Sequence, residues 1–515
     1  MGGGAATGEF SVQGRWIKES IEISSWLFII KSLQYCFIYY PRAGLDSDDY
    51  AALWYTTNTP YNNVGGFDPS KPSIMILHPM FLCSKWLDNQ FGDFRLDYGY
   101  NLIAFDMRVA GKSVCRPSGK HDSWVDAADL AFAARSLHLP PVHVLALESI
   151  STLCAMRFAL LYVFLSAIDD GDGPIGYRFP EMCLSLTLSN IPGPLERDKW
   201  FTTGLEELLQ SWCCASDLES FEHIAKEATR FVAGPSCDDP DLIDDLITYW
   251  EVELPPTKSQ RIAEQLNILL NRTPLSNAAL GRITQPVLVL HAERSESCPR
   301  KYADRLAEKL VSVQGGAVVY TVKGVAGSLS IIPGHASIAN QAFVKFLARL
   351  PKSRSDIRPP EVPLQQRMQQ ALDTLAELVG DETIRQRNPL SPLSFSGLAP
   401  DKVASQSETL AHYGELQKTA FTPLRPDGVP ARKYSERRNY HWFQSERNGL
   451  SYAGASIPAT SRQTKEPELE LLDTRAPLPS LDSPPPPSPL QCSLARKEIT
   501  NFPGKSQNCA CAAQR

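Results

Sequence analysis

The chain of 515 residues lacks several features that mark particular classes of protein. Its net charge is only −6, from 51 basic and 57 acidic side chains, so there is no surplus of positive charge for binding nucleic acid. Its 12 cysteines are scattered, without the paired spacing of a zinc site or a disulfide framework. The sequence therefore predicts reduced thiols, no metal, no cofactor and no nucleic-acid partner.

No apolar run is long enough to cross a membrane as a helix. The longest, residues 26–40, is interrupted by Lys31 and Gln34, whereas a helical span needs about 20 mostly apolar residues. We favour a strand pair or a buried helix there. Lipidation signals also fail, because Ala6 stands where a myristoylation start needs Ser or Thr, and the CaaX-like sequence that starts at Cys511 is followed by Arg515. The sequence predicts a cytoplasmic protein with no stable membrane span.

Proline, in contrast, is plentiful and unevenly placed. Of the 40 prolines, 20 follow Leu350, where Ser-Pro pairs begin at Ser391, Ser483 and Ser488. Such segments are typical of extended, kinase-accessible chain. We expect residues 351–515 to be a Pro/Ser-rich, largely disordered tail with one short amphipathic helix near 362–380, and we consider the tail a candidate site for a protein partner.

The first 350 residues show the alternation of an α/β protein. Short apolar strands are expected at 73–78, 102–106, 142–147, 184–188, 287–291 and 317–322, with helices between them. This order predicts a doubly wound, mainly parallel sheet. We expect a core of residues 46–192 and 285–350, preceded by an extension over 1–45.

About 95 residues between the fourth and fifth of these strands have only helical periodicity. An all-helical insertion of this kind indicates a cap over the carboxyl ends of the strands, where open α/β sheets bind ligands. We place the cap at residues 193–284 and expect it to be wholly helical.

The strand and helix order over residues 46–350 resembles the α/β-hydrolase superfamily. His78-Pro79-Met80-Phe81 stands where that superfamily has its oxyanion loop, and residues 106–113 resemble its Asp-x-Arg-Gly-x-Gly-x-Ser turn. The resemblance implies an α/β-hydrolase fold with an inserted helical cap. It also makes His78, Pro79, Met80 and Phe81 the candidate oxyanion-loop and pocket residues.

The resemblance implies a catalytic triad, whose nucleophile sits in a Gly-x-Ser-x-Gly turn between a strand and a helix. Alignment of strand 142–147 with this motif puts Glu148 at the nucleophile position, and the acid and histidine positions hold Ser295 and Ser328. Three substitutions argue against a working triad, because Glu, Ser and Ser cannot pass the proton that it needs. Ser149 and His335 are the remaining candidates for a rebuilt site.

Three hypotheses for function follow. The first is a non-catalytic or strongly diverged protein that binds a small apolar ligand or a partner under its cap. The second is an active hydrolase of ester, lactone or epoxide substrates that uses Ser149 or Glu148. The third gives the main role to the tail. For the first two, we expect Glu148 at the tip of its turn beneath the cap, with a raised pKa unless a basic residue is near.

Residues 163–179 separate a helix from the next strand and are rich in Asp and Gly. A loop of this length is unusual in a compact α/β unit. We predict a surface insertion without a bound metal, and a retained intron translated in frame is a further explanation.

Overall fold

The structure is a computed structural model that describes residues 29–32, 35–39, 49–161, 163–164, 179–180, 182–193, 199–235 and 237–431. Ten strands in this part of the chain form one sheet. They are β1 (Ile29–Ser32), β2 (Tyr35–Tyr39), β3 (Ala51–Thr57), β4 (Ser73–Leu77), β5 (Asn101–Phe105), β6 (Val114–Cys115), β7 (Val142–Leu147), β10 (Cys183–Ser189), β11 (Val287–Ala292) and β12 (Val318–Val322).

The strands lie in the order β1-β2-β3-β5-β4-β7-β10-β11-β12, with β6 beside β3. The run from β5 to β12 is parallel, and β1, β2 and β3 are antiparallel. All six predicted strands are confirmed, and so is a strand pair within residues 26–40. Since β2 pairs with β3 through Phe37 and Trp54, the sheet begins inside the segment expected to be a separate extension.

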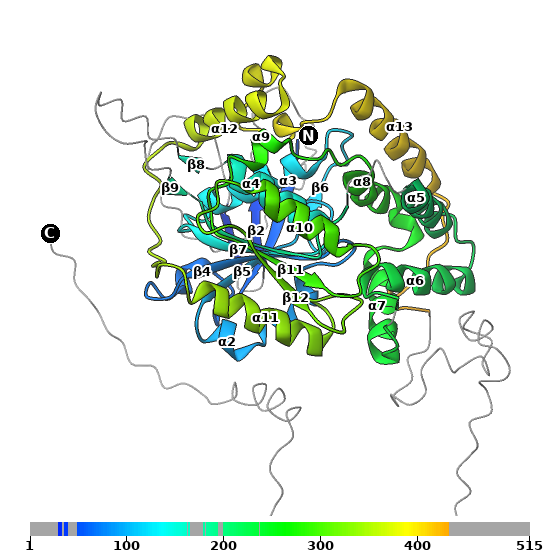
Figure 1. Ribbon diagram of the computed structural model, residues 1–515. Coiled ribbons are helices and arrows are strands. Elements are labelled where there is room, and N and C mark those ends of the chain that lie inside the picture. The colour runs from blue at the N-terminus through cyan, green and yellow to red at the C-terminus, as the bar shows by residue number, and fades with distance from the viewer. Residues whose placement is uncertain are drawn as a thin grey trace, which may run out of the picture. The chain divides into compact units, whose positions relative to one another are not determined.

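Helices cover both faces of the sheet (Figure 1). One face carries α3 (Ser123–Ser136), α4 (Ile150–Leu161) and α10 (Arg300–Lys309), and the other carries α1 (Asp88–Phe91), α2 (Phe94–Asp97) and α11 (Pro333–Leu347). Along β4, Met75 and Leu77 pack on the first face and Ile74 and Ile76 on the second. A parallel strand that is buried on both sides has an unbroken apolar sequence, which is why β4 could be recognised in the sequence.

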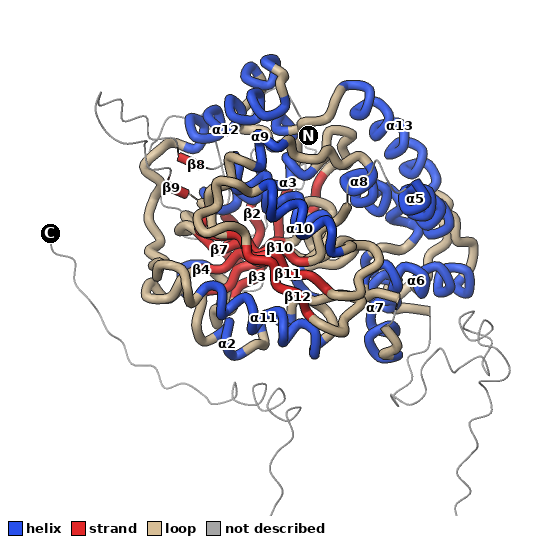
Figure 2. The backbone as a smooth tube through the Cα atoms, in the orientation of Figure 1, coloured by secondary structure: helices blue, strands red, loops and turns tan. Residues whose placement is uncertain are grey.

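A helical insertion lies between β10 and β11, beyond one end of the strands (Figure 2). Its helices are α5 (Lys199–Cys213), α6 (Leu218–Val232), α7 (Pro240–Glu253), α8 (Ser259–Leu270) and α9 (Asn277–Leu280). No strand occurs among the described residues of this interval. The cap has its own apolar core, where Trp212 and Trp250 lie 5.2 Å apart between ring centres and pack with Phe81.

The first part of the predicted tail is folded, so the expectation of a loose chain from residue 351 is wrong for 351–431. This segment contains α12 (Leu364–Val379), the short 3-10 helix Pro392–Phe395 (η6) and α13 (Pro400–Leu416). The amphipathic helix predicted near 362–380 is α12, and its apolar face joins the core beside α4. The remainder of the predicted tail, 432–515, lies outside the described residues.

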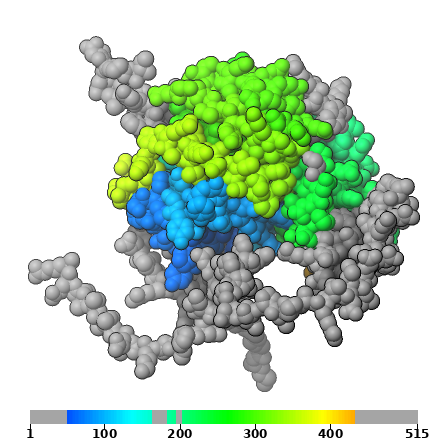
Figure 3. Space-filling view, turned by 60° about the horizontal axis from the view of Figure 1, so that its bottom comes forward, coloured from blue at the N-terminus to red at the C-terminus, as the bar shows by residue number. Residues whose placement is uncertain are grey.

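The C-terminal segment contacts both the sheet domain and the cap. The Ser73 and Ser355 hydroxyls are 2.7 Å apart, and the Ser259 hydroxyl of α8 donates to the Tyr413 carbonyl of α13 at 3.2 Å. In the space-filling view, yellow-green surface from around residue 350 adjoins blue surface from the first hundred residues (Figure 3). The composition of this segment suggested a solvated tail. The segment is folded nevertheless, because the apolar face of α12 is buried in the core.

The predicted insertion at 163–179 begins and ends in a small antiparallel ladder. Here β8 (Val163–Phe164) pairs with β9 (Phe179–Pro180), while 165–178 lie outside the described residues. Elsewhere in the described chain, no helix is both long and apolar enough to cross a membrane.

Candidate functional site at the turn after β7

The turn between β7 and α4 is sharp and has an unusual backbone. Glu148 and Ser149 have φ values of +69° and +49°, the left-handed region that side chains other than glycine rarely occupy. The turn is fixed because helix α4 starts directly on it, with the Ser151 amide donating to the Glu148 carbonyl at 3.2 Å. Glu148 therefore stands at the tip of a strained strand-to-helix turn, at the carboxyl end of a central parallel strand.

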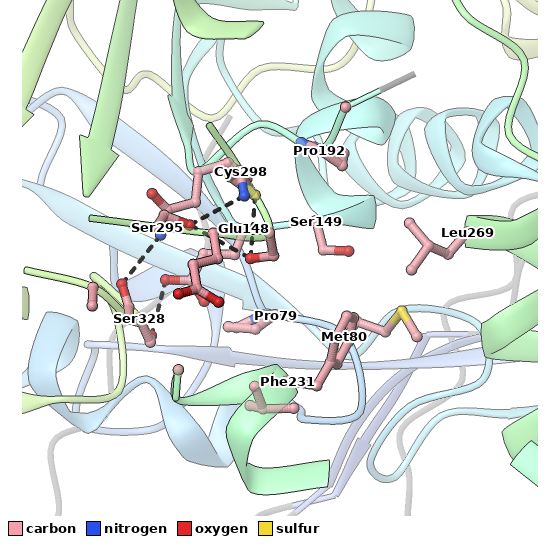
Figure 4. A pocket seen from close by; sticks show the side chains of 18 of the residues that line it. Pro79, Met80, Glu148, Ser149, Pro192, Phe231, Leu269, Ser295, Cys298 and Ser328 are labelled. Atoms are coloured by element: carbon pink, nitrogen blue, oxygen red, sulfur yellow. Dashed lines mark hydrogen bonds between the residues drawn. The ribbon is translucent and has the colours of Figure 1, made fainter. Parts of the chain in front are cut away.

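The Glu148 carboxyl points to the loop that follows β12 (Figure 4). Its Oε1 accepts hydrogen bonds from the Ser328 hydroxyl at 2.9 Å and from the Leu329 amide at 2.6 Å. Ser328 is in turn held by the cap, because its amide donates to the Ala233 carbonyl at the end of α6, at 2.9 Å. The residue before it must be glycine, since a Cβ on Gly327 would lie 1.9 Å from that carbonyl oxygen.

Burial dominates the electrostatics of Glu148. The side chain is desolvated, which raises the pKa of its carboxyl to about 7, although the hydrogen bonds from Leu329, Ser328, Ser330 and Asn190 act in the opposite direction. Only neutral donors contribute, and no basic side chain of the described residues is among the causes of the shift. Near neutral pH, this carboxyl can therefore act both as a donor and as an acceptor.

Of the other positions implied by the triad, Ser328 contacts Glu148 and Ser295 does not. The Ser295 hydroxyl faces its own loop, where it accepts from the Cys298 amide at 3.2 Å. Of the two candidates for a rebuilt site, Ser149 and His335, Ser149 lines the same cavity as Glu148. His335 does not line it, and its Nδ1 lies 3.1 Å from the backbone oxygen of Ser328.

Only two of the four candidate oxyanion-loop residues reach the cavity, namely Pro79 and Met80. The expectation for His78 as a pocket residue is wrong, because both its ring nitrogens bond the backbone: Nε2 accepts from the Met107 amide and Nδ1 lies 2.8 Å from the Pro79 oxygen. Phe81 is also outside the cavity. Its ring packs in the cap core, and cap side chains bond both its amide and its carbonyl.

The cavity lies between the β7 turn, the cap and the loops after β10, β11 and β12. It has a volume of about 80 Å³ for the centres of water-sized molecules, which leaves room for several waters or a small molecule. Its walls include these side chains that the sequence reading missed: Asn190, Phe231, Leu269, Arg272 and Cys298.

The sequence could have pointed to Asn190, because this residue directly follows strand β10. In the structure, its Oδ1 accepts from the Ala292 amide of the neighbouring strand at 3.0 Å. Residues at adjacent carboxyl ends of parallel strands meet at one edge of the sheet. For the cap residues, the sequence held no such signal, because helical periodicity indicates which face of a helix is buried but not what that face covers. In the described chain, no cluster of three or more His, Cys, Asp or Glu side chains could hold a metal ion.

The strand order, the antiparallel strand β3 beside the parallel run, the sharp turn after β7 and the helical insertion after β10 decide the fold class. The fold is that of the α/β hydrolases. No protein-family model and no curated protein matches the sequence.

Solved α/β-hydrolase structures resemble the chain at low identity. An enol-lactonase from Burkholderia xenovorans has 14% identity and a TM-score of 0.43, covering 58% of this chain and 97% of its own. A hydrolase from Pseudomonas aeruginosa has 18% identity and a TM-score of 0.44, covering 62% and 99%. An esterase from Thermogutta terrifontis has 16% identity and a TM-score of 0.42, covering 58% and 94%.

Proposed function

We propose that this α/β-hydrolase-fold protein is non-catalytic and binds a small, mostly apolar molecule in the cavity beside Glu148. The observation that carries the proposal is the hydrogen bond from the Ser328 hydroxyl to the Glu148 carboxyl. In a hydrolase triad, an imidazole takes the proton of the nucleophile and returns it to the leaving group. A serine hydroxyl at that position cannot do so, because it is far too weak a base.

The surrounding histidines support the same conclusion. Among the described residues, no imidazole forms a hydrogen bond with Glu148 or with the Ser149 hydroxyl. Within the described chain, His335 hydrogen-bonds the Ser328 backbone, and both ring nitrogens of His78 are used. A covalent ester on either residue would lack a base to activate the water that releases it.

The composition of the cavity wall supports a ligand with one polar group on an apolar body. Met80, Phe231 and Leu269 give apolar surface, and Glu148, Asn190 and Ser328 are buried polar groups in the same wall, among which the Glu148 carboxyl is the one that can ionise. A carbonyl or hydroxyl oxygen could accept a hydrogen bond from the protonated carboxyl. Such pairing of apolar walls with few directed polar groups is typical of small-molecule sites.

Two measurements on the full chain test the proposal. A fluorophosphonate probe should leave every serine unlabelled, and phenyl acetate, used as a small apolar ester, should bind in ligand-observed NMR without releasing acetate. Ser297→Trp, an exposed position on the cavity wall, should abolish that binding by filling the entrance. Stoichiometric labelling of a serine that is lost in Ser149→Ala would overturn the proposal, as would failure of phenyl acetate to bind.

A second candidate function is an active hydrolase with a rebuilt site. The left-handed turn at Glu148 and Ser149 favours it, because a strained turn of this kind exposes a nucleophile in the superfamily. In that mechanism, the Glu148 carboxylate attacks a carbon of an epoxide, the ring C–O bond breaks as its oxygen takes up a proton, and water then hydrolyses the resulting ester to free Glu148. Single turnover in ¹⁸O-labelled water would place the label in Glu148, whereas the non-catalytic proposal expects none.

A further inference from the structure

A second cavity lies on the other side of the loop that follows β10. It is enclosed by α4, α10 and residues 272–275, and it has a volume of about 200 Å³ for the centres of water-sized molecules. The two cavities share Pro192, Gly193 and Arg272 in their walls. Between them, Arg272 Nη2 donates to the Gly193 carbonyl at 2.6 Å, so this contact lies where the cavities adjoin.

Most of this second wall is apolar. The apolar side chains include Leu153, Met156, Ile191, Pro274, Leu280 and Leu306. They come from α4, α9, α10 and two loops and form a surface that an alkyl chain or a ring can contact on several sides. Space of this kind favours the burial of apolar ligand surface.

The charged residues of the same wall are all of one sign. Arg157, Arg272, Arg305 and Lys309 line the cavity, and no Asp or Glu does. An apolar cavity with only cationic charges attracts an anion and repels a cation, because the low-dielectric walls strengthen the field.

Arg157 is the most informative of these residues, because it is a buried charge without a direct counter-ion. It is only 1% exposed, and it donates to the Leu153 and Thr273 carbonyls at 3.2 and 2.6 Å. Its Nε has no hydrogen-bond partner, and no carboxylate of the described residues forms an ion pair with it. Burial lowers the pKa of the guanidinium to about 10, with Asp122 acting in the opposite direction. A buried cation of this kind is costly unless it is compensated.

Arg305 and Lys309 occupy the exposed side of the same cavity. They stand one turn apart on α10, so their side chains share a face of that helix. Within the described chain, neither forms an ion pair, whereas Arg300 on the same helix pairs with Asp304 at 2.7 Å. Two unpaired cations at the entrance of an apolar cavity mark the place where an anionic head group would sit.

We infer that this cavity binds an amphiphilic carboxylate, with its apolar part between α4 and α10 and its carboxylate beside Arg305 and Lys309. Arg157 then adds positive potential at the wall, and the ligand supplies the negative charge that the cavity lining lacks. This cavity adjoins the one beside Glu148, but the inference does not depend on what that cavity does.

Octanoate is a suitable probe, with octanol and octylammonium as neutral and cationic molecules of the same chain length. By calorimetry on the full chain, octanoate should bind at least tenfold more tightly than either, and it should raise the melting temperature. The double variant Arg305→Gln/Lys309→Gln should weaken octanoate binding about tenfold, because it removes both head-group contacts while leaving the apolar wall.

Lys323→Gln/Lys345→Gln is the matched control, since it makes the same charge change at exposed positions away from this cavity. It should leave octanoate affinity unchanged, as should Ser297→Trp, which fills the other cavity. Equal binding of octanoate and octanol, equal weakening by both double variants, or no octanoate binding would each overturn the inference. Loss of octanoate binding in Ser297→Trp would place the ligand beside Glu148 instead.

Discussion

Two buried regions of this protein handle charge in opposite ways. Around Arg108, charges are matched: its Nε lies 2.8 Å from Asp129 Oδ2 and its Nη1 lies 3.2 Å from Asp49 Oδ1. Around Glu148, a single carboxyl meets only hydroxyl and amide donors. Both side chains are buried, with Arg108 1% and Glu148 8% exposed, so exposure does not explain the difference.

The comparison separates a structural cluster from a candidate site. Buried charges that are fully paired fix one arrangement of the chain and leave nothing for a ligand. A buried carboxyl with a raised pKa, at the edge of a cavity, keeps hydrogen-bonding capacity that a ligand can use. The second cavity likewise has a buried ionisable group in its wall, but there the group is the cationic side chain of Arg157.

The Arg108 cluster also joins distant parts of the chain. Asp129 lies on α3, Asp49 lies just before β3, and Asp49 Oδ2 accepts from the Leu393 amide at 3.0 Å. The Ser391 hydroxyl bonds the same oxygen. One guanidinium therefore supports the sheet, a helix and the C-terminal segment together.

The largest effect is expected from Arg108→Met, which leaves two buried carboxylates without a cation. We expect it to lower the free energy of unfolding by about 5 kcal/mol or to prevent folding, because uncompensated buried charge is expensive. Urea denaturation at pH 7 measures the effect. Arg300→Met, which breaks the exposed pair with Asp304, is the control and should cost less than about 1 kcal/mol. A loss of similar size in both variants would contradict the distinction between buried and exposed pairs.

This comparison also shows how far the sequence could be read. Four of the parallel strands, β4, β5, β7 and β11, were predictable because each is buried along its whole length and therefore mostly apolar, whereas β12 is half exposed and was recognised from its β-branched residues. The position of Glu148 followed from the strand before it and the helix after it. The substitutions at Ser295 and Ser328 were visible in the sequence.

The partners in space were not predictable. Nothing local connects His121 with Glu264, which lie 143 residues apart in the chain and 2.9 Å apart in the structure. The loop around Ser328 was expected to hold a failed triad position, but its contact with Glu148 depends on the close approach of Gly327 to the cap. The folding of α12 and α13 was missed because proline content describes the average of a segment and not its apolar stripe.

A somewhat smaller effect, with a clear pH dependence, is expected at His121. Its ring lies between Asp126 and Glu264, each 2.9 Å away. Burial lowers the pKa of this imidazole, but the two carboxylates outweigh it and raise the value from 6.5 to about 10. The folded protein therefore holds a proton that the unfolded chain releases above pH 6.5. The stabilisation is fully present below pH 6.5 and is lost as pH rises toward 10.

Substitution His121→Gln should remove this dependence. At pH 6.5 we expect the variant to be less stable than the wild type by about 4 kcal/mol, because it loses a buried cation that is paired with two carboxylates. Urea midpoints at several pH values would show the gap closing as pH approaches 10. A gap that stays constant over this range would mean that the imidazole is neutral in the folded protein.

The smallest of the three effects is expected at Glu148, where it tests the other side of the comparison. Burial raises the pKa of this carboxyl from 4.5 to about 7, so folding favours proton uptake. The corresponding stability is fully present below pH 4.5 and is lost as pH rises through 7, where the ionised form must be accommodated without a cation. Over that range, the wild type should lose about 3 kcal/mol relative to Glu148→Gln, which cannot ionise.

Glu148→Gln keeps an acceptor for the Ser328 and Leu329 donors. Ser149→Ala is the control, because it leaves the carboxyl in place and should keep the wild-type pH profile of the free energy of unfolding. Parallel profiles for wild type and Glu148→Gln would show that the neutral donors Ser328 and Leu329 compensate the ionised carboxylate without a cation, and the two regions would then no longer differ in kind.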